Sequence, residues 1–246
     1  MSHPSELPVT IPQFQQNCLR SVSDRSVFSF SKPVVLLGGG ACAHDTLLQL
    51  LQLSYPLIAA DGGANNLDDV SIVPEMIIGD LDSLKNRSYW ESKTQVVELA
   101  EQDTTDFEKC LYTVDAPAYI ALGFTGKRLD HTLASLHVAA KYSLLKKVVL
   151  VGDDDIVLIC RKAQQFTLKK GMRFSIYPLE PVSFSGSTGL LYPLNGLTLA
   201  PTTMIGTSNE VLDNQVAAET EQDSGGAYAV LLPVAALASV LEQVID

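Results

Sequence analysis

Short apolar runs alternate with segments of helical periodicity between residues 34 and 151. We predict strands at the apolar runs, which are 34–37, 57–60, 75–78, 95–99, 118–122 and 148–151. Helices are predicted after the glycines that follow the first run, up to about Leu53, and over 106–114 and 130–145. Strands that alternate with helices in this way indicate βαβ units and a parallel sheet.

The pattern changes after residues 152–155, where short apolar or β-branched runs follow one another with Gly and Pro between them. These runs are 156–160, 165–168, 172–177, 182–184, 190–192, 197–200, 211–217 and 227–232, and a helical segment follows over 234–245. Closely spaced strands with turn signals predict an antiparallel sandwich or barrel. The predicted fold class is therefore α/β, with an N-terminal Rossmann-like parallel-sheet domain (32–153) followed by a C-terminal antiparallel β-sandwich or barrel domain (154–246). A loosely ordered lead-in is expected over 1–31.

The charge of the chain narrows the classes of ligand. Lys and Arg number 17 against 28 Asp and Glu, which gives a net charge of −11. Such a chain lacks the broad basic surface of a nonspecific nucleic-acid binder, so no nucleic-acid partner is expected. No Lys or Arg follows Arg173. The C-terminal part therefore cannot clamp a phosphate with cationic side chains but tolerates a cationic ligand, although an ordinary acidic surface explains the same composition.

Cysteine spacing and hydropathy indicate in which cellular compartment the protein is expected. The four cysteines, Cys18, Cys42, Cys110 and Cys160, form no CxxC pair and indicate neither a zinc site nor a disulfide framework. Residues 1–33 lack the basic start and apolar core of a signal peptide, and no apolar stretch reaches membrane-spanning length. We expect a cytoplasmic protein with no membrane partner.

Acidic side chains follow the apolar runs at four places, and they carry the most informative chemistry of the chain. They are Asp61, the pair Asp80 and Asp82, the pair Asp103 and Asp106, and Asp130. The carboxyl ends of parallel strands share one edge, where ligands bind in open α/β sheets. Six carboxylates gathered there would repel one another unless a multivalent cation held them together. The pattern predicts a metal and phosphate site.

Gly79-Asp80-Leu81-Asp82-Ser83 is the most specific of these motifs. Two Asp residues at i and i+2 beyond a strand can both reach Mg²⁺, which prefers one or two carboxylates plus water and phosphate oxygens. An Asx turn that merely ends the strand is the structural alternative. Asp103-Thr104-Thr105-Asp106 precedes a predicted helix, so it is either an ordinary helix cap or an anion site. In the second case Asp106 serves the metal, Thr105 faces phosphate and Lys109 adds positive charge.

A glycine-containing segment follows the run at 118–122. In Gly123-Phe124-Thr125-Gly126-Lys127-Arg128 the glycines let the backbone approach a nucleotide, and Arg128 can hold phosphate oxygens bidentately. Gly38-Gly39-Gly40 does not complete G-x-G-x-x-G, since Cys42 and Ala43 stand where further glycines are needed, and it lacks the Lys of a Walker A loop. We expect a tight turn near phosphate there and a structural role for His137.

Together the four motifs resemble those of the thiamin pyrophosphokinase (thiamin diphosphokinase) family, and the resemblance spans roughly residues 34–232. Ser187-Thr188-Gly189-Leu190 and Gly206-Thr207-Ser208-Asn209-Glu210 belong to it as well. The resemblance implies an enzyme, ATP:thiamin diphosphotransferase, that uses Mg²⁺ and transfers a pyrophosphoryl group from ATP to the thiamin hydroxyl, giving thiamin diphosphate and AMP. It also implies a homodimer with the active site between subunits, ATP on the α/β domain of one and thiamin on the β domain of the other.

The resemblance further implies roles for individual residues. The metal ligands would be Asp61, Asp80, Asp82 and Asp106. The catalytic residues would be Asp80, Asp82, Asp106 and Arg128, with Asp80 or Asp106 as the base. ATP would be bound by Asp61, Asn65, Gln102, Thr105, Lys109, Arg128 and Asp130, and thiamin by Ser208, Asn209 and Tyr192. Tyr192 stands near the position where many relatives carry Trp, and it would offer the thiazolium cation a smaller π face.

Rival functions stay open at this level. A related pyrophosphokinase acting on another alcohol, such as a hydroxymethyl pterin, would use the same acidic edge. A non-catalytic nucleotide sensor would keep Arg128 and the glycines but would not need the full set of carboxylates. A nicotinamide oxidoreductase is disfavoured by the broken glycine pattern and by the acids beside the phosphates.

Overall fold

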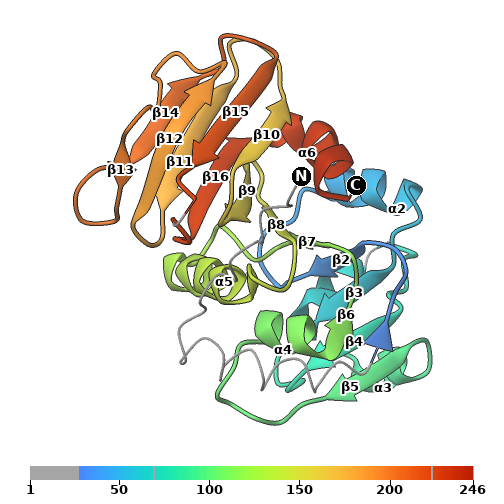
Figure 1. Cartoon of the computed structure of the whole chain (residues 1–246). Helices are drawn as coiled ribbons and strands as arrows, with labels where there is room; N and C mark the ends of the chain where they lie inside the picture. The colour runs from blue at the N-terminus through green and yellow to red at the C-terminus, as the bar shows by residue number, and fades with distance from the viewer. Residues whose placement is uncertain (1–27, 69, 223, 246) are drawn as a thin grey trace, which may run out of the picture.

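The structure, a computed structural model, describes residues 28–68, 70–222 and 224–245 (Figure 1). The lead-in predicted over 1–31 lies mostly outside the described residues. At its end, β1 (Phe28–Ser29) pairs in parallel with β6 (Val114–Asp115). The predicted mixed α/β class is confirmed.

A ten-stranded sheet runs through the molecule in the order β14-β11-β16-β9-β8-β7-β2-β3-β4-β5. Its parallel part consists of β2 (Val34–Leu37), β3 (Leu57–Ala60), β4 (Met76–Gly79), β5 (Gln95–Glu98), β7 (Tyr119–Leu122) and β8 (Val148–Val151). Each of these strands lies within one residue of a predicted run. The agreement is close because most of them are buried along their whole length and are therefore continuously apolar.

The rest of the ten-stranded sheet is antiparallel and consists of β9 (Asp155–Cys160), β16 (Tyr228–Pro233), β11 (Arg173–Pro178) and β14 (Gly206–Glu210). A four-stranded sheet contains β10 (Gln164–Thr167), β15 (Gln215–Thr220), β12 (Val182–Thr188) and β13 (Thr198–Leu199). The strand predicted at 190–192 is wrong, since only Leu190 bridges Val211 there. Sequence analysis missed β14, because Gly-Thr-Ser-Asn-Glu contains no apolar run.

Helices cover both faces of the parallel part (Figure 1). They are α2 (His44–Gln52), α3 (Arg87–Glu91), α4 (Asp106–Thr113), α5 (Leu129–Tyr142), α6 (Leu237–Ile245) and the 3₁₀ helices η1 (Asp61–Leu67) and η2 (Val234–Ala236). Alternate strand residues enter two different cores: Val35 and Leu37 pack with α2, whereas Val34 and Leu36 belong to the core of α4 and α5. The helices predicted over 106–114 and 130–145 are confirmed as α4 and α5, each with slightly different ends.

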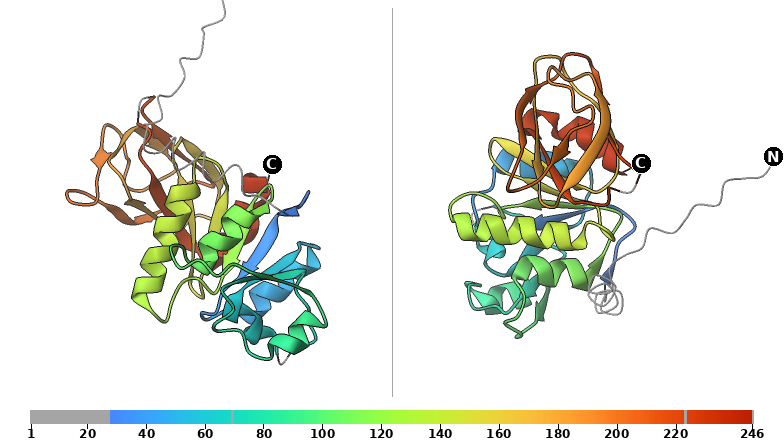
Figure 2. Two further views of the ribbon diagram at one scale, coloured as in Figure 1. Left: turned by 90° about the horizontal axis from the view of Figure 1, so that it is seen from below. Right: turned by 60° about the vertical axis from the view of Figure 1, so that its left-hand side comes forward.

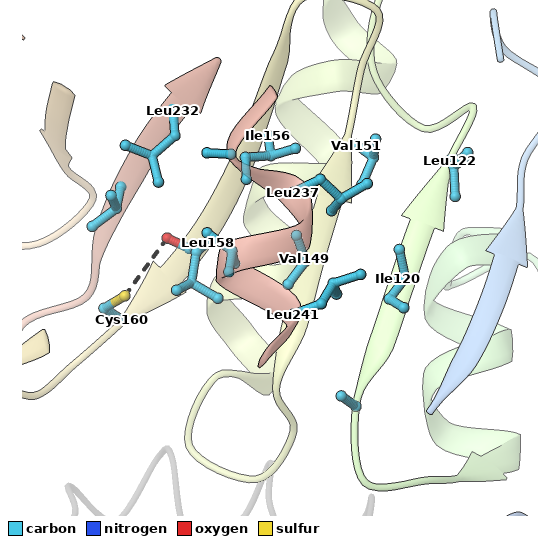
Figure 3. Close-up of a cluster of buried hydrophobic side chains, with 14 of the residues drawn as sticks. Ile120, Leu122, Val149, Val151, Ile156, Leu158, Cys160, Leu232, Leu237 and Leu241 are labelled. Carbon is cyan, nitrogen blue, oxygen red and sulfur yellow. Dashed lines mark hydrogen bonds between the residues drawn. The ribbon is translucent and has the colours of Figure 1, made fainter. Parts of the chain in front are cut away.

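The two segments predicted as domains share a sheet and a core. Val149 and Val151 of β8 belong to the same buried cluster as Ile156 and Leu158 of β9, and Figure 3 shows α6 lying across these strands. The change from parallel to antiparallel pairing occurs between β8 and β9. The remaining C-terminal strands rise from this shared layer as a lobe (Figure 2). In the described ranges no helix combines the length and the apolar character that a bilayer crossing requires.

Candidate active site

A cavity of about 560 Å³ opens beyond the carboxyl ends of β2, β3, β4 and β7. We call it the rim pocket; its main lining segments are 38–40, 60–62, 104–107 and 123–128, with further residues from α5. The topology explains this position, because the predicted loops all leave the same edge of parallel strands. The glycines after β2 allow two loops of the pocket to approach each other. A Cβ on Gly38 or Gly40 would lie 2.6 or 2.5 Å from the carbonyl oxygen of Gly123. The segment 38–40 therefore packs closely against the loop after β7, and the tight turn near phosphate expected there stays a prediction.

Three of the predicted carboxylates form a cluster, of which Asp61 and Asp80 line the rim pocket and Asp82 does not. Asp61, Asp80 and Asp82 each offer an oxygen atom, and these atoms lie within 4.8 Å of one another. Gly79 makes the approach possible, since a Cβ there would lie 2.6 Å from Cβ of Asp61 and 3.2 Å from Oδ1 of Asp106. Leu81, between two of the acids, has a positive φ of 64°, a strained backbone for a non-glycine residue. We refer to Asp61, Asp80, Asp82 and Asp106 together as the acid rim.

Asp61 is the acid whose surroundings call most clearly for a cation. Its side chain is 2% exposed, and its Oδ2 accepts a hydrogen bond of 3.1 Å from the backbone N–H of Ser83. Its Oδ1 is buried and has no hydrogen-bond partner. Burial raises the pKa of Asp61, and the charges of Asp106 and Asp80 raise it further. Buried charges are normally paired or bound to metal, so this donor set of carboxylate oxygens suits Mg²⁺.

Lys109 partly neutralises the acid rim. Its buried Nζ lies 3.1 Å from Oδ1 of Asp106 and 3.3 Å from Oδ2 of Asp80. Burial alone would lower the pKa of Lys109, but the two carboxylates raise it. For Asp80, burial opposes ionisation, while hydrogen bonds from Asp82 N–H, Gln102 and Lys109 together lower its pKa. Lys109 lines the rim pocket, which a phosphate-binding residue needs to do. The partners that the structure gives it are two acids, Asp80 and Asp106.

Other predicted ATP contacts have structural partners of their own. Gln102 Nε2 donates to Asp80 Oδ2 at 3.0 Å, and Thr105 Oγ1 caps α4 by accepting from Glu108 N–H at 3.2 Å. Asn65 accepts from Lys85 N–H and donates to Ser83 O, both at 2.9 Å, and so holds the loop after β4. Thr105 and Asn65 line the rim pocket and Gln102 does not. Their contacts with ATP stay predictions.

Arg128 lines the rim pocket but is held by an acid outside it. Its guanidinium makes two bonds to Asp130, Nε to Oδ1 at 3.1 Å and Nη2 to Oδ2 at 2.6 Å, and both side chains are exposed. Asp130 and Asp103 neither line the pocket nor join the carboxylate cluster. The expectation that all six carboxylates gather is therefore wrong for these two: Asp130 is paired with exposed Arg128, and Asp103 lies in the middle of the loop between β5 and α4.

The predicted thiamin residues lie together, away from the rim pocket. Asn209 is buried, and its side chain holds the backbone of Tyr192. The Asn209 amide accepts from the N–H of Tyr192 at 3.0 Å and donates to the carbonyl oxygen of Tyr192 at 2.7 Å. Tyr192 is 63% exposed, and Ser208 is exposed with a positive φ of 62°. Asn209 and Ser208 belong to β14, at the opposite end of the ten-stranded sheet from β4 and β5 (Figure 1).

Sequence analysis missed some residues that shape the rim pocket. The N–H of Ser83, at the end of the Gly79–Ser83 motif, donates to Asp61, and His131 of α5 lines the cavity. Glu101, one residue before the QDTTD motif, organises that loop through hydrogen bonds to Asp103 and Thr104. The sequence offered no signal for Glu101 beyond its adjacency to the motif.

Comparison with known proteins adds independent evidence. Residues 47–151 match the family model "Thiamin pyrophosphokinase, catalytic domain", and residues 159–224 match "Thiamin pyrophosphokinase, vitamin B1 binding domain". Together the two matches cover more than half of the chain. The chain belongs to the thiamin pyrophosphokinase family.

Relatives and solved structures agree with this family. Thiamine pyrophosphokinase 1 of Oryza sativa subsp. japonica is 26% identical over 200 residues, which are 68% of this chain and 75% of that protein. Thiamin pyrophosphokinase 1 of Caenorhabditis elegans is 29% identical over 177 residues, 65% of this chain and 72% of that protein. The fold is similar to that of thiamin pyrophosphokinase from Candida albicans (TM-score 0.70, 16% identity, 95% of this chain and 97% of that chain). It is also similar to thiamine pyrophosphokinase from Bacillus subtilis (TM-score 0.68, 22% identity, 82% and 99%).

Proposed function

We propose that the rim pocket is where this chain carries out the reaction of its family. As a member of the thiamin pyrophosphokinase family, the chain is an enzyme that transfers a pyrophosphoryl group from ATP to thiamin. The single observation that ties this reaction to the rim pocket is the convergence of Asp61, Asp80 and Asp82 beside the buried Lys109. A phosphate ligand needs cations, and this acidic group becomes favourable only when a cation accompanies the phosphates.

In the proposed reaction, the hydroxyl oxygen of thiamin attacks the β-phosphorus of ATP. A new bond forms between that oxygen and phosphorus, the bond from the β-phosphorus to the oxygen bridging the α-phosphate breaks, and AMP leaves with the electron pair. The hydroxyl proton passes to a carboxylate of the acid rim, either Asp80 or Asp106. Arg128 and Lys109 both line the rim pocket, where their positive charge would stabilise the transition state.

The residues that would hold Mg²⁺ are Asp61, Asp80 and Asp82, with Asp106 beside them. The unpaired buried Oδ1 of Asp61 supports this assignment most directly. When bound, Mg²⁺ would neutralise charge on the phosphate oxygens and fix their position. Besides adding positive charge near the phosphates, Lys109 would keep Asp80 and Asp106 in place by its two ion pairs.

The second half of the proposal concerns thiamin and the dimer. We assign ATP and metal to the segment 32–153 and thiamin to 154–246, and the two family matches fall on either side of this division. Tyr192, Ser208 and Asn209 do not line the rim pocket of their own chain. A homodimer in which the β-rich part of one subunit faces the rim pocket of the other would bring both substrates together. Exposed apolar residues on that part, among them Leu191, Met204 and Ile205, suit such a contact.

One experiment tests the proposed function against its rivals. The protein is incubated with ATP, Mg²⁺ and thiamin, and the products are separated by chromatography. We expect AMP and thiamin diphosphate in equal amounts and no product from a hydroxymethyl pterin. ADP in place of AMP would contradict pyrophosphoryl transfer, and saturable ATP binding without turnover would favour the nucleotide sensor.

A further inference from the structure

Glu101 lies between β5 and α4, just before the loop that carries Gln102, Thr105 and Asp106. Its carboxylate accepts hydrogen bonds at both oxygens. Oε2 accepts from the backbone N–H groups of Asp103 at 3.0 Å and Thr104 at 3.2 Å. Oε1 accepts from the hydroxyl of Thr104 and, at 2.8 Å, from the hydroxyl of Tyr112. Glu101 itself does not line the rim pocket, so it is placed to act on the loop rather than on a ligand.

Tyr112 connects this arrangement to the body of α4. Its side chain is 7% exposed, and it stands on the same helix that Asp106 begins. The bond from Tyr112 to Glu101 therefore fixes the start of the loop against the helix. The end of the loop is fixed separately, by the cap that Thr105 makes at Glu108 N–H. Both ends of a short loop are thus tied to one rigid element.

The loop contacts the acid rim at two places, through Gln102 and through Asp106 at the start of α4. Gln102 follows Glu101 directly, and its Nε2 donates to Oδ2 of Asp80 at 3.0 Å. The same oxygen of Asp80 is 3.3 Å from Nζ of Lys109. If the loop moved, Asp80 would lose one of these two partners, and Asp106 would shift with the start of α4. A shift of about 1 Å at a catalytic group is enough to lower a rate about 100-fold.

We propose that Glu101, anchored by Tyr112, is a positioning residue for the pyrophosphoryl transfer, because it holds the loop 101–105 so that Gln102 and Asp106 meet the acid rim. The proposal rests on the proposed function for its rate measurements. Its structural part stands on the loop alone and is measured without substrates.

The test compares Glu101→Ala, Glu101→Gln and Tyr112→Phe with Glu98→Ala, a matched control three residues earlier whose ion pair with Arg87 is exposed. We expect kcat to fall about 10- to 100-fold in Glu101→Ala, while KM for thiamin changes about twofold or less. Glu101→Gln, which keeps an acceptor oxygen, should recover part of the loss, and Tyr112→Phe should lose less than Glu101→Ala. Glu98→Ala should match the wild type, since exposed pairs contribute little.

A double variant shows whether Glu101 acts through its neighbour. Glu101→Ala combined with Gln102→Ala should be about as slow as the slower single variant, because coupled residues are not additive. Multiplied effects, or an unchanged kcat in Glu101→Ala, would overturn the proposal. Hydrogen exchange of amides 102–106 in the ligand-free protein should be faster in Glu101→Ala, and unchanged exchange would also overturn it. If the wild type forms no AMP with thiamin, the proposed function fails, while the exchange result still decides whether Glu101 orders the loop.

Discussion

Two carboxylates that stand two residues apart on α4 have opposite surroundings. Glu108 is 6% exposed, and its Oε1 accepts from Lys141 Nζ at 2.6 Å and from the Tyr142 hydroxyl at 3.3 Å. This group joins α4 to α5 and leaves the buried acid with partners. We call it the helix link (Glu108, Lys141 and Tyr142).

In the acid rim, by contrast, several acids lie near one another and one buried oxygen has no partner among the described residues. The charges of Asp106 and Asp80 act on Asp61, and Lys109 forms an ion pair with each of the first two. One buried oxygen of Asp61 is left without a partner. Glu108 is thus a buried acid whose partners join two helices, whereas the acid rim keeps an unpaired buried oxygen on Asp61 that suits a cation.

The largest expected effect is on catalysis at the acid rim. Asp80→Ala removes the acceptor of Gln102 and Lys109 and a carboxylate of the cluster. We expect turnover to fall about 100- to 1000-fold, the size seen when one electrostatic group is removed from an active site. AMP formation measures it, with exposed Asp45→Asn as an acidic control expected to match the wild type. An Asp80→Ala enzyme with more than about a tenth of wild-type turnover would contradict a catalytic role for the acid rim.

The next effect is ligand-linked stability. Because the folded state gathers the carboxylates and the unfolded chain does not, Mg²⁺ should stabilise the wild type, by about 2.7 kcal/mol when its concentration is 100 times the Kd. Thermal unfolding with Mg²⁺ and then with excess EDTA measures this. Asp61→Asn should lose most of the increase in Tm. An equal Tm increase in wild type and Asp61→Asn would show that Asp61 is not a ligand.

A change in the helix link should act on stability rather than turnover. Glu108→Ala leaves Lys141 and Tyr142 without this acceptor and should lower the free energy of unfolding by about 2–3 kcal/mol. Urea unfolding measures the loss, and turnover is assayed well below the transition. Glu108→Gln, which keeps one acceptor oxygen, should lose less. A large fall in turnover with unchanged stability would place Glu108 with the acid rim.

The smallest effect is a gain in stability without metal. Since burial raises the pKa of Asp61, its folded carboxyl holds its proton at a higher pH than the unfolded one. Stability is therefore lost as pH rises from the ordinary value of 3.8 through the raised folded value, and Asn at this position carries no such penalty. In EDTA at neutral pH, Asp61→Asn should be more stable than the wild type by about 1 kcal/mol. The difference should shrink as pH falls toward 3.8 and be lost below it; a variant less stable than wild type at neutral pH would contradict the prediction.

Much of the frame could be predicted from the sequence. The parallel strands are continuous apolar runs, and Asp61, Asp80 and Asp82 meet because they follow strands that pair side by side. The edge strand β14 was harder to predict from the sequence, because it is mostly polar and has no alternating pattern.

The partners within the site could not be predicted. Lys109 and Asp80 are 29 residues apart in the chain, and Gln102 and Asp80 are 22 apart. Nothing local in the sequence states that these side chains bind acids rather than phosphate. The same holds for Glu101, whose anchor Tyr112 lies 11 residues further on. Such contacts depend on how α4 packs beside β4, which is a tertiary property.

Binding of Mn²⁺, followed by electron paramagnetic resonance, tests the acid rim as a cation site most directly. The titration is made in the presence of α,β-methylene ATP, in which the bond that pyrophosphoryl transfer would break cannot be cleaved. Wild type and Asp45→Asn should bind Mn²⁺ tightly, whereas Asp80→Ala and Asp61→Asn, each shown to be folded by circular dichroism, should bind it at least about 10-fold more weakly. Equal affinity in all four proteins would show that these carboxylates do not hold the metal, and the proposed site would be wrong.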